Sequence, residues 1–249
     1  MHKLSIILPT YNETKGNYLA QILASLQQLT ASRHSEVIAV DSGSQDATLD
    51  LLSTYGVPHI SIPQKSRACR LNTGVEAAQG DFLVLHHPRS YMHSHNWIQL
   101  YDSLGCGTLD SPLWGGLTHT FDAQHPILRC TSWYSNFRVQ QRSIVYLDHC
   151  ILMAKSLAQQ VFPIPDMDIF EDTEISRRLS RLARAQLLPF TVTTSALRFR
   201  KHGVYRQLCT NQIMKCLYHL KVSPTWMNRI YERSLQLNTE YAMHKRPKD

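Results

Sequence analysis

Acidic and basic side chains at a few places in the chain are of types that carry out chemistry. Glu171 and Asp172 are adjacent acids at the start of an expected helix. A carboxylate can take a proton from a reacting hydroxyl, although two acids in a first helical turn also complement the helix dipole. Asp41 follows a strand-like segment, and Arg67 and Arg70 lie near another expected helix start. A guanidinium offers a fork of donors that suits two phosphate oxygens.

The first half of the chain alternates strand-like and helix-like segments, and these elements must position the reactive groups. Apolar runs predict four strands, at Leu4–Leu8, Glu36–Val40, Ile60–Ile62 and Phe82–Leu85. Apolar residues three and four apart predict helices over residues 19–29, 47–55 and 71–78. Asp46 is expected to cap the second of these helices, and Gly80 is expected to end the third.

This alternation predicts right-handed βαβ units and a parallel sheet. In such sheets, ligands bind beyond the carboxyl ends of the strands. Three loops are therefore expected to lie together in space, at Pro9–Glu13, Asp41–Asp46 and His86–Ser90. The topology alone does not identify the ligand.

The second half of the chain gives a weaker pattern. Between Tyr91 and Asp148 no long periodic element is predicted, apart from a strand region that begins at Trp114–Leu117. Helical order returns over Phe170–Arg184, and the residues expected on its apolar face are Ile175, Leu179 and Leu182. Another strand is predicted at Thr191–Thr194.

The C-terminal fifth of the chain carries the excess positive charge. From Arg198 to Asp249 there are 11 Lys or Arg and 3 Asp or Glu, whereas the chain before Arg198 has 15 and 16. Such a tail is typical of contact with a lipid surface, a nucleic acid or a phosphorylated substrate, and also of a plain solvated face. An apolar stripe runs through it at Cys209, Ile213, Leu217 and Leu220. Since no nucleic-acid motif is present, residues 206–221 are expected to contact a membrane surface rather than nucleic acid.

Composition and cysteine pattern indicate where the protein works. With 249 residues, of which 43% are hydrophobic, the chain can bury a sizeable core. The six cysteines form no Cys-x-x-Cys pair, which argues against a zinc site or a disulfide scaffold and suits a reducing cytosol. No targeting segment and no apolar run of roughly 18 residues is visible. We therefore expect a cytoplasmic protein that reaches the inner membrane face peripherally.

Longer motifs place the site residues in context. Ser5–Glu13 and Val40–Thr48 resemble the opening signatures of family 2 glycosyltransferases, each at an expected strand end. Ser66–Gly74 is similar to an Arg-rich segment followed by Asn-x-Gly in a subgroup of that family. Phe162–Arg181 resembles the family's Glu-Asp motif, and Thr193–Val204 resembles a branch associated with arsenosugar-type biosynthesis clusters. The resemblance covers nearly the whole chain and is weakest in its middle.

The resemblance implies an α/β fold of the GT-A (Rossmann-like) nucleotide-diphospho-sugar transferase type, with a mostly parallel central sheet. We expect a single domain over residues 1–249. Within it, the nucleotide-binding half, the acceptor-side half and a basic helical C-terminal extension are expected at residues 1–90, 91–197 and 198–249. The implied function is transfer of a sugar, with inversion, from a nucleotide-diphosphate donor such as a UDP-sugar to an acceptor hydroxyl. The sequence names neither the sugar nor the acceptor.

The residues that the resemblance assigns to the nucleotide are Pro9, Thr10, Tyr11, Glu13, Asp41, Arg67, Asn72 and Arg89. A uracil ring needs a flat partner and an acceptor for its N–H, which Tyr11 and Asp41 could supply, with Thr10 bonding nearby. Arg67 is preferred to Arg70 for the diphosphate. The alternative is that these loops only form turns and that the arginines belong to an ordinary surface.

The Glu-Asp motif assigns Asp172 as the general base, with Glu171 as the next candidate. Asp148 and Arg177 are candidates for the acceptor side. Asp148 stands where the family has a Gly-Asp pair, but Leu147 replaces the glycine.

The loop after the fourth expected strand departs from the family's pattern. Family members hold a divalent cation (Mg²⁺ or Mn²⁺) there with an Asp-x-Asp motif, whereas this chain has His86, His87, Pro88 and Arg89. Proline has no ligand atom, and His86 does not suit these hard cations. Three interpretations stay open. Arg89 replaces the cation, or His86 or Asp148 holds it in an unusual site, or the protein is a degenerate member that binds a nucleotide sugar without catalysis.

Overall fold

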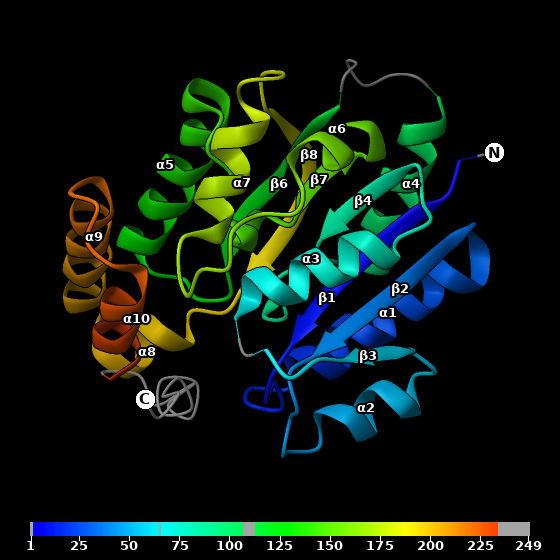
Figure 1. The fold of residues 1–249 in the computed structure, drawn as a ribbon, viewed down its shortest axis with the longest axis horizontal. Helices are drawn as coiled ribbons and strands as arrows, with labels where there is room; N and C mark the ends of the chain where they lie inside the picture. The colour runs from blue at the N-terminus through cyan, green and yellow to red at the C-terminus, as the bar shows by residue number, and fades with distance from the viewer. Residues whose placement is uncertain (1, 65, 107–112, 234–249) are drawn as a thin grey trace.

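The computed structural model describes residues 2–64, 66–106 and 113–233 (Figure 1). The described strands join in one eight-stranded sheet, in the order β3-β2-β1-β4-β7-β6-β8-β5. Their bounds are β1 Leu4–Thr10, β2 Ser35–Asp41, β3 His59–Ser61, β4 Phe82–Leu85, β5 Ser90–Tyr91, β6 Trp114–Phe121, β7 Ile151–Ala154 and β8 Gln186–Thr194. Residues 234–249 of the expected basic extension lie outside the described residues.

The sheet is mostly parallel, as the sequence predicts. Strands β3, β2, β1 and β4 run in one direction, β7 runs against both β4 and β6, and β8 is parallel to β6. Of the described strands, only β7 and β5 therefore oppose the common direction. Because β7 is antiparallel to both β4 and β6, strands β6 and β8 run parallel to β1, β2 and β4. The carboxyl ends of all five strands therefore lie at the same edge of the sheet.

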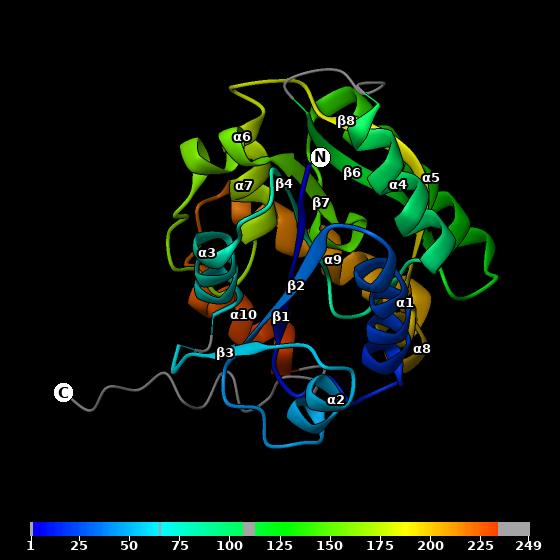
Figure 2. The same ribbon diagram turned by 90° about the vertical axis from the view of Figure 1, so that its right-hand side faces the viewer.

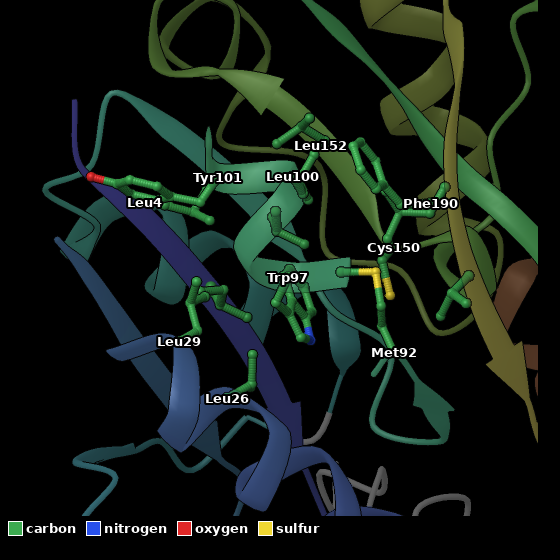
Figure 3. Close-up of a cluster of buried hydrophobic side chains, with 14 of the residues drawn as sticks. Leu4, Leu26, Leu29, Met92, Trp97, Leu100, Tyr101, Cys150, Leu152 and Phe190 are labelled. Atoms are coloured by element: carbon green, nitrogen blue, oxygen red, sulfur yellow. The ribbon is translucent and has the colours of Figure 1, made fainter. Parts of the chain in front are cut away.

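Helices cover both faces of the sheet (Figure 2). They are α1 Tyr18–Ser32, α2 Thr48–Thr54, α3 Arg67–Ala77, α4 Ser94–Gly105, α5 Pro126–Arg142, α6 Lys155–Val161, α7 Glu171–Leu179, α8 Leu197–His202, α9 Val204–His219 and α10 Pro224–Arg233, with a 3₁₀ turn at Leu147–His149. The α1 and α4 helices pack on one face, in a cluster that contains Trp97 and Leu152 (Figure 3). The α3, α6 and α7 helices pack on the other face, around Ile7 and Met153.

Alternation along the strands separates these two cores. Leu4 and Ile6 of β1 point into the first cluster, whereas Ile7 points into the second. The α3 helix lies very close to β1: a Cβ atom added to Gly74 would stand only 2.3 Å from Cγ2 of Ile7. This close approach gives a physical reason for the glycine in the Asn-x-Gly segment.

Several local predictions need correction. The middle of the chain contains the two long helices α4 and α5, which the sequence pattern does not predict. The helix expected over Phe170–Arg184 ends at Leu179, and Leu182 is exposed. Neither Asp46 nor Gly80 caps its helix: the N-cap of α2 is Ala47 and the C-cap of α3 is Ala78. The Asp46 carboxylate instead accepts from the backbone N–H groups of Thr14 (3.1 Å) and Thr48 (3.0 Å).

The C-terminal helices α8, α9 and α10 gather beyond the carboxyl ends of β6 and β8 (Figure 1). Asp122, just after β6, fastens α8: its Oδ2 pairs with Nη2 of Arg200 at 2.9 Å, and its Oδ1 accepts from the N–H of the N-cap residue Ala196 at 2.7 Å. Every helix in the described part of the chain is too short or too polar to cross a lipid bilayer.

Candidate functional site

A cavity of about 340 Å³ opens at the carboxyl edge of the sheet. The first half of the chain contributes Pro9, Glu13, Arg67, Arg70, His87, Pro88 and Arg89 to its lining. The second half contributes residues from β6, α5, the 3₁₀ turn, the segment before α7, and the helices α8, α9 and α10. Both halves of the chain therefore meet around one space, at the edge where parallel sheets bind ligands.

The three loops expected to lie together do so. The Arg89 Nε donates to Glu13 Oε2 at 3.0 Å, and both side chains are buried. The Asn12 N–H donates to the Ser44 hydroxyl at 2.9 Å, and the Asn12 carbonyl oxygen Oδ1 accepts from the Gln45 N–H at 2.8 Å. These contacts join the loop after β1 to the loops after β2 and β4.

Asp41 and Tyr11 do not line this cavity. Asp41 is fully buried, and its Oδ1 accepts from the backbone N–H groups of Gly43 (2.8 Å) and Ser44 (2.7 Å). Its Oδ2 accepts from the hydroxyls of Thr10 (2.9 Å) and Ser44 (2.6 Å). The Tyr11 side chain is only 3% exposed. In this conformation Asp41 shapes its own loop, which is the local bonding that short acidic side chains favour.

Arg67 and Arg70 reach the cavity from the first turn of α3, which Ser66 caps by accepting from the Cys69 N–H. The Arg67 Nε donates to Oε1 of Glu171, which is fully buried. Asn72 lies on the same helix but does not line the cavity. Its side-chain amide bonds both backbone groups of Ile164, at 2.8 and 2.9 Å, and so fastens the segment before α7 to α3.

Asp172 lines the cavity from the first turn of α7. Its Oδ2 accepts from the Leu147 N–H at 3.1 Å, and its Oδ1 accepts from the Thr173 N–H at 2.7 Å. Burial and then the charge of Glu171 raise the pKa of Asp172 to about 6, against an opposing effect of Arg67. A carboxyl group with a raised pKa that faces a cavity is suited to accept a proton at neutral pH. Arg177, in contrast, pairs with Glu174 at 2.8 Å and is not a lining residue.

The segment in place of the Asp-x-Asp motif does not present His86 to the cavity. His86 is fully buried against Trp97, with ring centroids 5.6 Å apart, and burial lowers the pKa of its imidazole to about 4. The lining residues are His87, Pro88 and Arg89. Among the described residues, no group of three or more His, Cys, Asp or Glu side chains is arranged to hold a metal ion.

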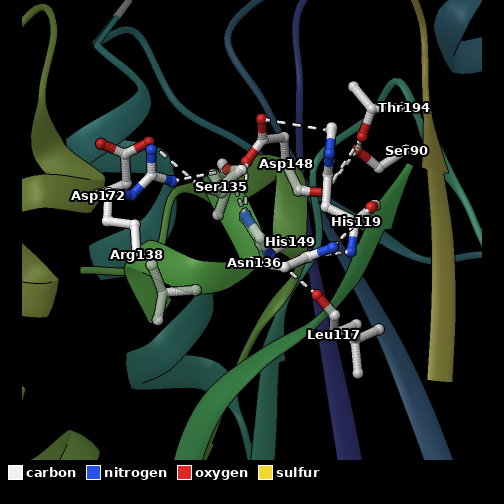
Figure 4. A network of polar contacts seen from close by, with 12 residues as sticks. Ser90, Leu117, His119, Ser135, Asn136, Arg138, Asp148, His149, Asp172 and Thr194 are labelled. Carbon is white, nitrogen blue, oxygen red and sulfur yellow. Dashed lines mark hydrogen bonds and ion pairs between the residues drawn. The ribbon is translucent and has the colours of Figure 1, made fainter. Parts of the chain in front are cut away.

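Asp148 belongs to a polar network on the acceptor-side half (Figure 4). Its Oδ2 lies 3.6 Å from His119 Nε2, and its Oδ1 lies 4.0 Å from His149 Nε2. The same His149 nitrogen lies 2.8 Å from the Ser135 hydroxyl, and His149 Nδ1 lies 2.9 Å from the Leu117 carbonyl. Burial lowers the pKa of His149 to about 4, so this imidazole is neutral at pH 7 and its Nδ1–H donates to the carbonyl.

Sequence reasoning missed the lining residues on α5 and α9. The α5 helix turns Thr131, Ser135 and Arg138 toward the cavity, and α9 turns Gln207, Asn211 and Lys215 toward it. In each helix these residues are spaced three or four apart, so they share one face. A search for polar rather than apolar helical stripes would have found both.

Two sequence comparisons each match about a third of the chain. Residues 5–94 match the sequence model of Glycosyl transferase family 2. The chain is also 33% identical over 89 residues to the uncharacterized glycosyltransferase YfnE of Bacillus subtilis (strain 168). That match covers 34% of this chain and 22% of the relative. The match to the family model therefore lies in the first half of the chain.

The fold is that of GT-A glycosyltransferases. TarS of S. aureus, solved in complex with UDP, has a TM-score of 0.58 and 19% identity over 78% of this chain and 60% of that one. A mannosyltransferase of Pyrobaculum calidifontis, in complex with GDP-Man and Mn²⁺, has a TM-score of 0.60 and 15% identity over 94% and 74%. Glucosyl-3-phosphoglycerate synthase of Mycobacterium tuberculosis, solved with Mn²⁺, UDP and glucosyl-3-phosphoglycerate, has a TM-score of 0.56 and 16% identity over 78% and 71%.

Proposed function

We propose that the protein is a glycosyltransferase that moves a sugar from a nucleotide-diphosphate donor to an acceptor hydroxyl, with inversion. The observation that carries this proposal is the placement of Asp172. Its carboxyl group, with a raised pKa, lines the same cavity as Arg67, Arg70 and Arg89. A proton acceptor and a set of phosphate-binding cations around one space are what the reaction requires.

In the proposed reaction, Asp172 takes the proton of the acceptor hydroxyl. The hydroxyl oxygen attacks the anomeric carbon, and the bond between that carbon and the diphosphate oxygen breaks on the opposite side. The diphosphate leaves with the bonding electron pair, and arginine side chains stabilise its charge. Glu171 is not a proton acceptor in this scheme, because it is buried and paired with Arg67. It positions that arginine and raises the pKa of Asp172.

The donor is proposed to be a UDP-sugar. The match of residues 5–94 to family 2 and the UDP complexes of TarS and the mycobacterial synthase support this choice. Asp41 is proposed to bind the base through its loop rather than by a free carboxylate oxygen, since Thr10 and Ser44 already occupy both oxygens.

The cavity does not fit a divalent cation held by an Asp-x-Asp motif. Two of the structural neighbours were solved with Mn²⁺. In this chain, however, the corresponding loop lines the cavity with His87, Pro88 and Arg89, and the nearby Glu13 is already paired with Arg89. Mg²⁺ and Mn²⁺ prefer carboxylate and water oxygens. We therefore assign neutralisation of the diphosphate to the arginines. The alternative is a protein that binds a nucleotide sugar without catalysis.

The test is calorimetric titration with UDP, with Mn²⁺ and with a chelator, for the wild type, Asp172→Asn and the control Asp50→Asn, which removes an exposed acid on α2. UDP should bind equally well under both conditions to all three proteins. With a UDP-sugar, Asp172→Asn should lose transfer or donor hydrolysis by about 10²–10⁴-fold, the usual effect of removing a general base. Binding that requires Mn²⁺ would overturn the assignment to arginines. Full turnover by Asp172→Asn would show that Asp172 is not the base. UDP binding without any turnover by the wild type would favour the non-catalytic alternative.

We also propose that α9 contacts an anionic membrane surface from the cytoplasmic side. One side of this helix lines the cavity with Gln207, Asn211 and Lys215, whereas a stripe that includes large apolar side chains points to solvent. The outward stripe is spaced at four, four, three and four residues, and it comprises Tyr205, Cys209, Ile213, Cys216 and Leu220. Tyr205 is 72% exposed and Leu220 is 74% exposed. Large exposed apolar side chains along one helix face mark an interaction surface.

Charge complementarity selects an anionic bilayer as the partner. From Ile175 to Tyr231 the sequence contains no Asp or Glu, whereas it contains 11 Lys or Arg. Arg206 and Lys221 lie exposed near the two ends of α9, and Trp226 is exposed on α10. Interfacial helices combine apolar and basic side chains in this way. The proposed contact lies within residues 206–221 and extends to α10.

A further inference from the structure

Two cations contact one aromatic ring in the acceptor-side half of the cavity. The guanidinium carbon of Arg138, from α5, lies 3.7 Å from the centroid of the Tyr146 ring. The Nζ atom of Lys215, from α9, lies 5.7 Å from the same centroid. All three side chains line the cavity. Positive charge from two distant helices is thus brought to one place.

Among the described residues, no carboxylate lies in direct contact with either cation. The Arg138 Nε donates to the Ile144 carbonyl at 3.2 Å, and its Nη2 donates to the Ser135 hydroxyl at 2.9 Å. Both of these acceptors are uncharged. Within the described part of the chain, neither Arg138 nor Lys215 forms an ion pair with a carboxylate. The charge of Asp148 reaches both groups, but its oxygens lie nearest to the imidazoles of His119 and His149.

Two cavity arginines from the first half of the chain differ from this pair in having a carboxylate partner. Arg67 pairs with Glu171, and Arg89 pairs with Glu13. Arg138 is only 6% exposed and Lys215 is half-buried, so their charges are costly to hold when no carboxylate bonds to them directly. Burial and the nearby Arg138 lower the pKa of the Lys215 ammonium, which is the expected sign of that cost. A bound anion would relieve it.

The position of the pair relates it to the reacting groups. Tyr146 immediately precedes Leu147, whose N–H donates to Asp172 Oδ2 at 3.1 Å. The negative charge of Asp172 and the positive charge of Arg138 both act on the pKa of Tyr146, which burial raises to about 12. A ligand anion bound here would therefore lie close to the proposed base.

We propose that Arg138 of α5 and Lys215 of α9, which both lie against the Tyr146 ring, form a subsite for a phosphate group carried by the acceptor. The acceptor class is then a hydroxyl compound that bears a phosphate. A phosphate monoester carries about two negative charges at neutral pH, which matches two cations, and Arg offers the forked donors that phosphate favours. That the ligand is an acceptor rests on the proposed transferase function, whereas the phosphate-binding site does not depend on it.

The probes are inorganic phosphate, glycerol 3-phosphate and monomeric dihexanoylphosphatidic acid, which are titrated into protein that is saturated with UDP. Lys215→Met removes the charge and keeps most of the side-chain length, and the matched control is Lys201→Met, at an exposed residue of α8 that lies outside the cavity lining and outside residues 206–221. The wild type and the control should bind phosphate, whereas Lys215→Met should bind it roughly ten-fold more weakly or not at all. UDP affinity should stay within about two-fold in all three proteins, since the donor lies elsewhere.

Each outcome has a definite meaning. Equal phosphate binding by Lys215→Met and wild type would overturn the subsite. Weaker UDP binding by Lys215→Met would overturn it too, because the cations would then belong to the donor. If UDP does not bind, the transferase proposal fails, and the same phosphate titration without UDP still tests the subsite. Tighter binding of the lipid analogue than of glycerol 3-phosphate would identify a lipid headgroup as the source of the phosphate, and equal binding would identify a soluble one.

Discussion

The environment of Asp172 controls when it can act as a base. The charged groups around it are Glu171 on the same helix, Arg67 on α3, and Asp148 in the 3₁₀ turn. Burial and the two acids raise its pKa to about 6, and the arginine opposes them. Because a raised pKa keeps the carboxyl group protonated to higher pH, the active carboxylate is lost as the pH falls through about 6.

The rate should depend on pH through Asp172. For the wild type, kcat/KM should fall below about pH 6. Glu171→Gln should move this limb to lower pH, because it removes a negative charge beside Asp172 and leaves the effect of Arg67 unopposed. Steady-state rates from pH 4.5 to 8 measure the limb, with Glu76→Gln, exposed on α3, as the control. An unchanged limb in Glu171→Gln would show that another group sets it.

Single residues show where sequence reasoning works and where it stops. Arg67, Arg89, Glu13 and Asp172 are brought to the cavity, in agreement with the motif. Asp41, Asn72 and His86 are of suitable chemical types, but their side chains bond to nearby backbone or pack in the core. A residue's type does not determine where its side chain points. Polar side chains that satisfy local backbone groups look the same in sequence as those that await a ligand.

At the scale of elements, α3 depends on its approach to β1. A Cβ atom on Gly74 would stand 2.3 Å from Cγ2 of Ile7, so Gly74→Ala forces that side chain or the helix to move. We expect a loss of about 1–3 kcal/mol in the free energy of unfolding, which is typical of overpacking. Urea denaturation measures it, and the exposed Glu76→Ala on the same helix should change stability by less than about 0.5 kcal/mol. Equal stability of the two variants would mean that α3 and β1 can separate at Gly74 and Ile7 without loss of stability.

The α5 and α9 helices explain why the second half of the chain was harder to predict. Helix prediction from apolar periodicity assumes that the apolar face turns inward. In α9, Gln207, Asn211 and Lys215 line the cavity. Of the apolar stripe predicted there, Cys209, Ile213 and Leu220 are exposed and Leu217 is half-buried. In α5, Trp133 and Phe137 are exposed and stack on each other, while Ser135 and Arg138 are buried. Such patterns identify a helix face without telling whether it lies inside.

At the scale of the whole molecule, the parallel half of the sheet could be predicted because each of its strands is a local apolar run. In the remaining half, the sequence predicts parts of β6 and β8, at Trp114–Leu117 and Thr191–Thr194, but not which strands they pair with, because the partners lie far apart in the sequence. The antiparallel β7 joins β4 to β6, and β8 pairs with β6 through a register shift between Leu117 and Thr118. No local pattern encodes these partners. They nevertheless decide that both halves of the chain face one cavity.

Membrane contact is also a property of the whole molecule. The protein should float with vesicles that contain phosphatidylglycerol and should not float with phosphatidylcholine alone, since the surface is basic. An Ile213→Ser and Leu220→Ser double variant should bind roughly ten-fold more weakly, and Gln212→Ser on the same helix is the control. Flotation that is unchanged by the double variant would place the contact elsewhere. A dimer in solution that the double variant dissociates would show that the stripe meets a second copy of the chain.

The two exposed environments of α9, one side toward solvent and one toward the cavity, set the distance between the cavity and the proposed membrane surface. If its apolar stripe rests at the headgroup level, its opposite face, which lines the cavity, lies about one helix diameter, ~10 Å, farther from the bilayer. The reaction would then take place within the layer that lipid headgroups can reach by bending upward. A hydroxyl on such a headgroup could enter the cavity while its acyl chains stayed in the hydrocarbon. The thickness of a single helix would thus set how long a membrane-bound substrate must be.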